Sequence, residues 1–199
     1  MKDKVLIIAC GAIALELNQL KKLNSWDHLT IQCLDAELHN MPKLIPGKIK
    51  EKLDEMSDSF SKVFVAYADC GTGGLLDTLL EKYNVERLPG AHCYEFYSGS
   101  ETFKQLHANE MGTFYLTDFL VKHFDRLVIK GLGLDKYPEL KQEYFRHYKK
   151  VVYLAQSTSE ELMEKSKQYA TFLELEHAVH HTGLGNFKKH IEASIGVNG

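Results

Sequence analysis

The chain has 199 residues, of which 44% are hydrophobic and 26% are charged, a composition typical of a globular protein and not of a disordered or fibrous one. Its 24 Lys and Arg residues against 27 Asp and Glu residues give a formal net charge of -3, so no basic surplus indicates nucleic acid binding. The longest apolar run, residues 5–15, is too short for a bilayer span, which needs roughly 17 or more residues. We therefore expect neither a nucleic acid partner nor a membrane partner.

The first ten residues resemble a lipoprotein signal, because Met-Lys-Asp-Lys precedes an apolar stretch that ends at Cys10. That stretch is shorter than the roughly 7–15 apolar residues of a signal peptide, and Asp3 is acidic where a signal is basic. We therefore expect a cytoplasmic protein. In that reducing compartment, dispersed cysteines are more often ligands or catalysts than disulfides.

Short apolar runs rich in β-branched residues alternate along the chain with stretches of helical period. The predicted strands are 4–9, 28–34, 62–67, 151–155 and 175–180, with a short segment at 85–88. The predicted helices are 12–23, 46–56, 75–83, 102–107, 117–124, 138–147, 159–173 and 186–195, the last capped by Asn186. Residues 127–129 fit either a helix end or a short strand.

Strands that alternate with helices favour a mostly parallel sheet with helices on both faces. We predict a single α/β domain over residues 1–199, built on one doubly wound, mostly parallel sheet with an irregular middle segment at 89–138.

Three of the four cysteines follow short apolar runs, at points where a strand is expected to become a loop. They are Cys10 in VLIIACGA, Cys70 in VFVAYADCGTGG and Cys93 in PGAHCYEF. The carboxyl ends of the strands of an open α/β sheet meet at one crevice, so these thiols are expected to converge on a metal ion or cluster. His39, a few residues beyond the second strand, is a candidate fourth ligand or proton carrier; the alternative is a structural histidine. Cys33 lies inside a strand and is predicted to be a core residue.

The segment His92-Cys93-Tyr94-Glu95 places several chemically active side chains in one loop. Neighbouring residues of an extended segment point in opposite directions, so His92 and Cys93 are not both expected to ligate one ion. One of them would orient the other. The alternative is a surface loop in which Glu95 caps a helix.

The turn after the third strand, Cys70-Gly71-Thr72-Gly73-Gly74, joins a strand to a helix and is rich in glycine. Glycines let backbone amides converge at a helix start, which predicts an anion site at these four residues after Cys70 and a lowered thiol pKa for Cys70 itself. The spacing fits neither a Walker A loop nor a dinucleotide fingerprint. The alternative is a tight turn with a small buried cysteine.

Six segments of the chain together resemble an uncharacterised prokaryotic family, domain of unknown function family 1638. They are 9–12 (ACGA), 38–40 (LHN), 69–73 (DCGTG), 92–95 (HCYE), 113–119 (TFYLTDF) and 153–156 (YLAQ). The resemblance extends from about residue 5 to about residue 185. It implies no established activity, although members of that family often occur near genes of corrinoid-dependent methyl transfer.

These observations leave three hypotheses open. The first is a thiolate metal site made by Cys10, Cys70 and Cys93 with His39 or His92, holding zinc or a [4Fe–4S] cluster. The second is a metal-free enzyme with Cys70 as nucleophile, one of these histidines as base and the glycine turn as oxyanion hole. The third is a non-enzymatic accessory protein that carries a corrinoid or other cofactor, or binds a methyltransferase or corrinoid protein. All three include a small-molecule ligand or a partner.

Overall fold

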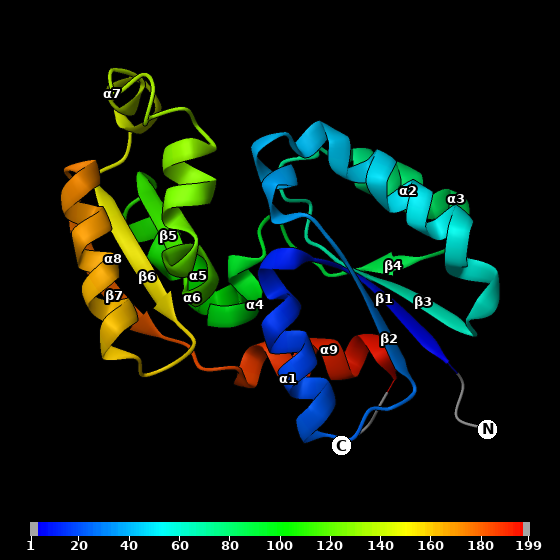
Figure 1. Cartoon of the computed structure of the whole chain (residues 1–199). Coiled ribbons are helices and arrows are strands. Elements are labelled where there is room, and N and C mark those ends of the chain that lie inside the picture. The colour runs from blue at the N-terminus through cyan, green and yellow to red at the C-terminus, as the bar shows by residue number, and fades with distance from the viewer. Residues whose placement is uncertain (1–3, 197–199) are drawn as a thin grey trace. The chain divides into compact units, whose positions relative to one another are not determined.

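The computed structural model describes residues 4–196, which form two compact units (Figure 1). Unit 1 contains residues 4–93 and 188–196, and unit 2 contains Tyr94–Phe187. The α/β class and the parallel strands are confirmed, but the strands form a four-stranded and a three-stranded sheet where one sheet was predicted. The assignment of the whole chain to a single domain stays a prediction.

The sheet of unit 1 has the order β2 (Leu29–Leu34), β1 (Val5–Cys10), β3 (Lys62–Ala66), β4 (Glu86–Arg87), and every pair is parallel. All six residues of β1 are buried. An entirely apolar strand is expected in this position, because the centre of a parallel sheet is covered by helices on both faces.

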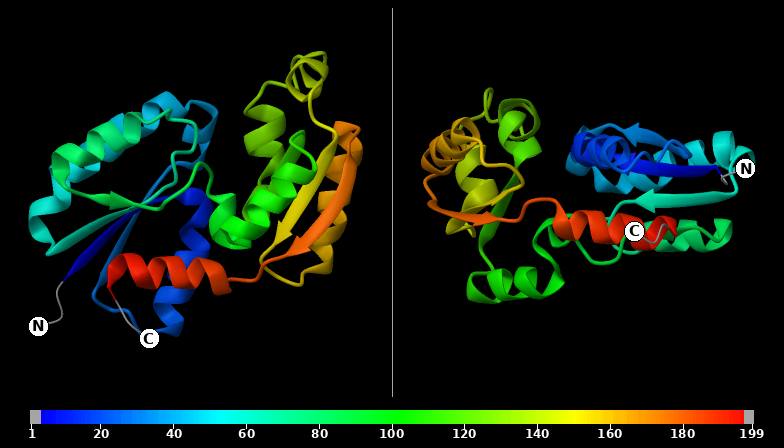
Figure 2. Two further views of the ribbon diagram at one scale, coloured as in Figure 1. Left: turned by 180° about the vertical axis from the view of Figure 1, so that it is seen from behind. Right: turned by 90° about the horizontal axis from the view of Figure 1, so that it is seen from below.

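Three helices connect these strands: α1 (Ala14–Leu23), α2 (Ile45–Met56) and α3 (Leu75–Tyr83). Helix α1 lies on one face of the sheet, and α2 and α3 lie on the other (Figures 1 and 2). This follows from right-handed crossovers, because the chain moves from β1 to β2 in one direction and from β2 past β1 to β3 in the opposite direction. The connections therefore diverge between the carboxyl ends of β1 and β3, the position at which open α/β sheets bind ligands.

Unit 2 has its own parallel sheet, β5 (Thr113–Thr117), β6 (Lys150–Ala155) and β7 (Glu176–His181). Alternate side chains of its strands enter two cores. Leu116 and Tyr153 pack with residues of the long helix α8 (Glu160–Leu173), and Tyr115 packs with Phe103 on the other face. The remaining helices of the chain are α4 (Tyr94–Ser98), α5 (Ser100–Asn109), α6 (Asp118–Lys122), α7 (Leu140–Phe145) and α9 (Gly185–Ile195), of which α9 belongs to unit 1 from residue 188 onward.

Most predicted elements are present within a few residues, and two local predictions need correction. Residues 113–117, which carry no predicted strand, form β5. Of the two alternatives considered for 127–129, the helix end is present, as a π-helix over Asp125–Lys130 that follows α6, and the strand is not. Asn186 lies inside α9, one residue after its start, and so does not cap it. No helix among residues 4–196 is both long enough and apolar enough to cross a membrane.

Candidate functional site

One residue with a ligating side chain follows or ends each of the four strands of unit 1. Cys10 is the last residue of β1, and His39 lies in the 3-10 helix η2 (Ala36–Asn40) directly after β2. Cys70 lies in the turn between β3 and α3, and Cys93 follows β4. Since all four strands are parallel, these residues share the carboxyl edge of the sheet.

Backbone hydrogen bonds bring Cys70 and Cys93 together. The amide of Asp69 donates to the carbonyl of Gly90 at 3.2 Å, and the amide of Cys70 donates to the carbonyl of Ala91 at 2.9 Å. These two bonds pair the end of β3 with the segment that leads to Cys93. As a result, the two Sγ atoms lie 3.2 Å apart, within hydrogen-bonding distance and with no disulfide between them.

A close approach of β1 to β2 brings Cys10 to His39. A Cβ atom on Gly11 would lie 2.9 Å from the carbonyl oxygen of Leu34, so only glycine fits without a shift. The Sγ atom of Cys10 accepts a hydrogen bond from the amide of Ala12 at 3.3 Å and lies 3.6 Å from His39 Nδ1.

The two ring nitrogens of His39 have different surroundings. Nδ1 lies 3.2 Å from the carbonyl oxygen of Ala36, an acceptor only, so we assign the Nδ1 proton to this bond. A histidine that donates one N–H to a carbonyl has its other nitrogen oriented and free to ligate. His39 Nε2 is therefore the candidate ligand atom.

The ligand atoms of His39, Cys70 and Cys93 all lie within 4.8 Å of one another. Cys10 does not belong to this group, and it contacts His39 at Nδ1, on the side of the ring away from Nε2. His92 does not belong to it either; its side chain is exposed. The structure thus places all three predicted cysteines at one edge, but groups His39 with only two of them.

The fourth cysteine was predicted to be a core residue, and this prediction is wrong. Cys33 lies inside β2 as expected, but its side chain is exposed. Strand β2 is at the edge of its sheet, and only its first and last residues are buried.

The pKa values show how charge is distributed in the cluster. A hydrogen bond from Cys70 lowers the pKa of Cys93 well below its ordinary value; burial opposes this, and the hydrogen bond and positive charge of His39 add to it. The same bond to Cys93, followed by burial, raises the pKa of the Cys70 thiol. Burial would lower the pKa of His39, but hydrogen bonds and charges from Cys10 and Cys93 raise it to about 11. Without a metal, these shifts favour an ionised Cys93 beside a protonated Cys70 and a protonated His39.

The carboxylate of Asp69 occupies the place predicted for a bound anion in the glycine turn. It accepts hydrogen bonds from the Thr72 hydroxyl at 2.7 Å and from the amides of Gly73 at 3.1 Å and Gly74 at 2.9 Å. The Thr72 amide donates to the Asp69 carbonyl. The anion site was predicted at Gly71, Thr72, Gly73 and Gly74, and the backbone amides of the last three already donate hydrogen bonds to Asp69. The pKa of Cys70, which the turn was expected to lower, is raised.

The turn also fixes the backbone of Cys70, whose φ of 49° lies in the left-handed region that non-glycine residues seldom adopt. The hydrogen bonds of Asp69 close this turn, and Gly73 and Gly74 have positive φ values of 63° and 84°. The position of the Cys70 sulfur thus depends on a carboxylate next to it in the chain.

Tyr67, one residue beyond β3, is a further member of the site that the sequence patterns did not single out. Its side chain is fully buried, and its ring stacks on that of His39 with centroids 6.2 Å apart. Burial first, then the charge of Cys10 and a hydrogen bond with it, and then the charges of Cys93 and Cys70, raise the pKa of its hydroxyl. The sequence signal that could have identified Tyr67 was a polar hydroxyl at the end of a predicted strand, two residues before Asp69.

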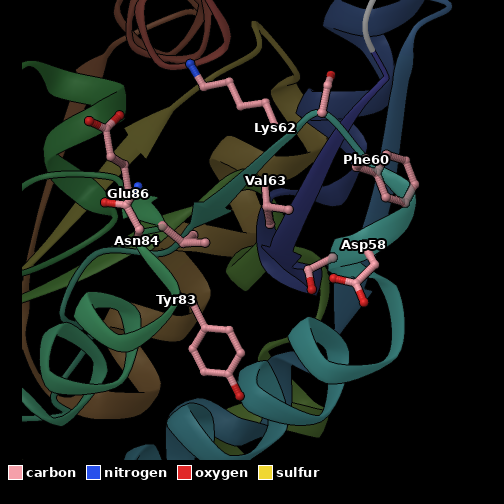
Figure 3. A pocket seen from close by; sticks show the side chains of 10 residues that line it. Asp58, Phe60, Lys62, Val63, Tyr83, Asn84 and Glu86 are labelled. Atoms are coloured by element: carbon pink, nitrogen blue, oxygen red, sulfur yellow. The ribbon is translucent and has the colours of Figure 1, made fainter.

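A pocket of about 620 Å³ lies elsewhere in unit 1, at the amino-terminal ends of β3 and β4 (Figure 3). Tyr83, Lys62, Val63 and Glu86 are among the residues that line it, and none of its lining residues is a cysteine or a histidine. The pocket is thus at the opposite edge of the sheet from the cysteines.

The fold and the cluster define an α/β protein with a His–Cys–Cys group at the carboxyl edge of a parallel sheet. The chain belongs to the family described as protein of unknown function (DUF1638), which matches residues 33–191 and confirms the resemblance. The match includes His39, Cys70 and Cys93 and begins after Cys10. No curated protein and no solved structure matches the chain.

Proposed function

We propose that unit 1 binds one zinc ion through His39 Nε2 and the thiolates of Cys70 and Cys93. The observation that supports this most strongly is that a ring nitrogen of His39 and the two sulfurs converge within 4.8 Å of one another, each residue delivered by a different strand connection. Imidazole and thiolate are the donors that zinc prefers, and two cysteines with one histidine are a known three-ligand set for catalytic zinc.

The spacing of the sulfurs favours a single ion over an iron–sulfur cluster. Two thiolates at about 2.3 Å from one tetrahedral zinc lie about 3.8 Å apart, so the 3.2 Å between Cys70 and Cys93 needs only a small separation. In a [4Fe–4S] cluster each cysteine binds a different iron atom, and the sulfurs would have to move much farther apart.

The position of Cys10 supports a site with an open coordination position. The Cys10 sulfur accepts a hydrogen bond from the Ala12 amide and lies against His39 Nδ1. Cys10 therefore orients the histidine and is not itself one of the proposed ligands. Three protein ligands leave one position of a tetrahedral ion for an exogenous molecule, which is the arrangement of catalytic zinc sites. The carboxyl ends of β1 and β3, where the chain connections diverge to opposite faces of the sheet, are the expected entry for that molecule.

The family resemblance extends this proposal to a biological role. We propose that the chain acts as an enzyme or accessory factor in corrinoid-dependent methyl or one-carbon metabolism, with a corrinoid protein or a methyltransferase as partner. A metal ion with an open position suits either role, because it can present a small molecule to a reaction or hold it for transfer to a partner.

One observation favours a second candidate function, a metal-free enzyme whose nucleophile is Cys93 and not Cys70. The lowered pKa of Cys93 beside the imidazolium of His39 is the arrangement of an activated cysteine. The originally predicted version, with Cys70 and a glycine-turn oxyanion hole, is disfavoured because Asp69 already accepts from the amides of Gly73 and Gly74.

Metal analysis of the full chain, purified without oxygen, tests the proposal. We expect about one zinc per chain in the wild type and loss of most of it in Cys70→Ser, Cys93→Ser and His39→Gln. The matched controls are Cys33→Ser and His92→Gln, which change exposed residues of the same types outside the cluster. Both should retain the full metal content.

Cobalt substitution makes the test specific to these ligands, because thiolate coordination of Co²⁺ produces an intense charge-transfer absorption that cobalt bound elsewhere lacks. Wild-type protein with neither zinc nor this absorption would overturn the metal site. If iodoacetamide then modified Cys93 much faster than Cys70, the metal-free alternative would take its place. A brown protein with iron and sulfide would instead support a cluster.

A further inference from the structure

The hydroxyl of Tyr67 is the most unusual polar group near the cluster. The side chain is 0% exposed, and Tyr67 Oη has no oxygen or nitrogen hydrogen-bond partner among the described residues; Cys10 offers it only a sulfur. A buried hydroxyl without a partner is rare in native structures, because its loss of water is not compensated. Such a group next to metal ligands indicates a missing partner in the site itself.

Two features place this hydroxyl at the cluster. The ring of Tyr67 is nearly parallel to that of His39, with an interplanar angle of 12°, so the phenol is held against the candidate ligand. The hydroxyl is also close enough to Cys10, Cys93 and Cys70 to interact electrostatically with each of them. Sulfur is a weak acceptor, so the neighbouring Cys10 does not replace an oxygen or nitrogen partner.

We propose that Tyr67 donates a hydrogen bond to a small anionic ligand that occupies the open coordination position of the metal. This inference rests on the proposed metal site and adds a preference among its exogenous ligands. A bound group that retains a lone pair, such as hydroxide, carboxylate or azide, satisfies both the ion and the buried hydroxyl. A ligand whose only lone pair binds the metal leaves the hydroxyl unpaired.

The test uses the Co²⁺-loaded full chain and two probes, azide and N-methylimidazole, each titrated by the visible spectrum. Azide can accept a hydrogen bond after it binds cobalt, whereas N-methylimidazole cannot. We expect Tyr67→Phe to weaken azide binding about tenfold, the effect of losing one hydrogen bond to a charged acceptor. Binding of N-methylimidazole should change less than twofold.

The matched control is Tyr115→Phe, because the hydroxyl of Tyr115 is also buried but interacts with Thr113, and its ring packs among Tyr94 and Phe103 in unit 2. It should leave both affinities unchanged. The wild type gives a second measurement, independent of any variant: the infrared stretch of cobalt-bound azide should shift when H2O is replaced by D2O.

The outcomes separate this inference from the proposed function. If the wild type lacks the thiolate charge-transfer absorption, the metal site itself is overturned. If cobalt binds but azide does not bind, or binds equally to wild type and Tyr67→Phe without a deuterium shift, the metal site stands and the role of Tyr67 is refuted.

Discussion

Removal of the Asp69 carboxylate should destabilise the metal-free protein by about 2 kcal/mol. Its hydrogen bonds to Gly73 and Gly74 resemble those of an N-cap, whose loss costs about 0.5–2 kcal/mol, and the bond from Thr72 to a charged acceptor adds about 1.5 kcal/mol. The sum is an upper value, because Gly73 is exposed and its amide can bind water when the carboxylate is absent.

The assay compares Asp69→Ala with Asp69→Asn by urea unfolding at neutral pH. Asparagine retains a side-chain oxygen for the turn amides and loses the charge, so its cost should be about half that of alanine. Asp69→Ala should also weaken Co²⁺ binding in proportion, because the turn no longer holds Cys70 in its left-handed conformation. A loss of less than about 0.5 kcal/mol, the range of ordinary surface substitutions, would refute the assigned role of the carboxylate.

Two further predictions concern the framework of the site. Gly11→Ala should destabilise the chain by about 1–3 kcal/mol, because the added Cβ would lie 2.9 Å from the Leu34 carbonyl oxygen. Gly47 is exposed in α2 with open space where a Cβ would be added. Gly47→Ala should therefore stabilise the chain by about 0.5–1 kcal/mol in the same unfolding assay. A harmless Gly11→Ala would contradict the close approach. Hydrogen bonds from Arg87 lower the pKa of Asp77, so Asp77 stabilises the fold above its unfolded pKa of about 3.9 and this contribution disappears as pH falls through its lower folded value. Asp77→Asn should therefore cost about 1 kcal/mol at pH 7 and progressively less as the pH falls below about 3.9, and a cost independent of pH would contradict the ion pair.

The fold of unit 1 could be predicted because its signals are local and mutually consistent. The run from Val5 to Cys10 is apolar throughout, and the stretches that follow have helical period, so strand, helix and parallel pairing agree with one another. The same reasoning missed β5. Residues 113–117 combine aromatic residues with threonine, and Thr117 is a good N-cap. The capping signal predicted the helix that follows, and the strand before it was not recognised.

The division into two sheets could not be read from the sequence, because alternation of strands and helices is identical for one sheet of seven strands and for two smaller ones. What separates the sheets is the segment between β4 and β5, which contains α4 and α5 and no strand. This segment was expected to be irregular, whereas two helices occupy most of it. Its consequence depends on which strands pair, and pairing is a long-range property.

The candidate site was predictable as a set of residues but not as a ligand group. Parallel strands place their carboxyl ends together, which was enough to bring Cys10, His39, Cys70 and Cys93 to one edge. Which of them meet depends on short-range details that carry little sequence signal, such as the pairing of Cys70 with Ala91 and the contact of Gly11 with Leu34.

The anion prediction shows the limit of motif reasoning most clearly. Glycines that free backbone amides for an external anion also free them for an internal one, and the competition depends on whether a carboxylate precedes the turn. Asp69 stands directly before Cys70, and its carboxylate accepts hydrogen bonds from the amides of Gly73 and Gly74. Because Asp69 is part of the chain, this contact does not carry the translational entropy cost of binding a free anion from solution. An aspartate at the head of a glycine turn therefore predicts a self-capped turn, whose role is to position the residue next to it. Here that residue is Cys70, so the turn acts on the metal site through geometry and not through charge.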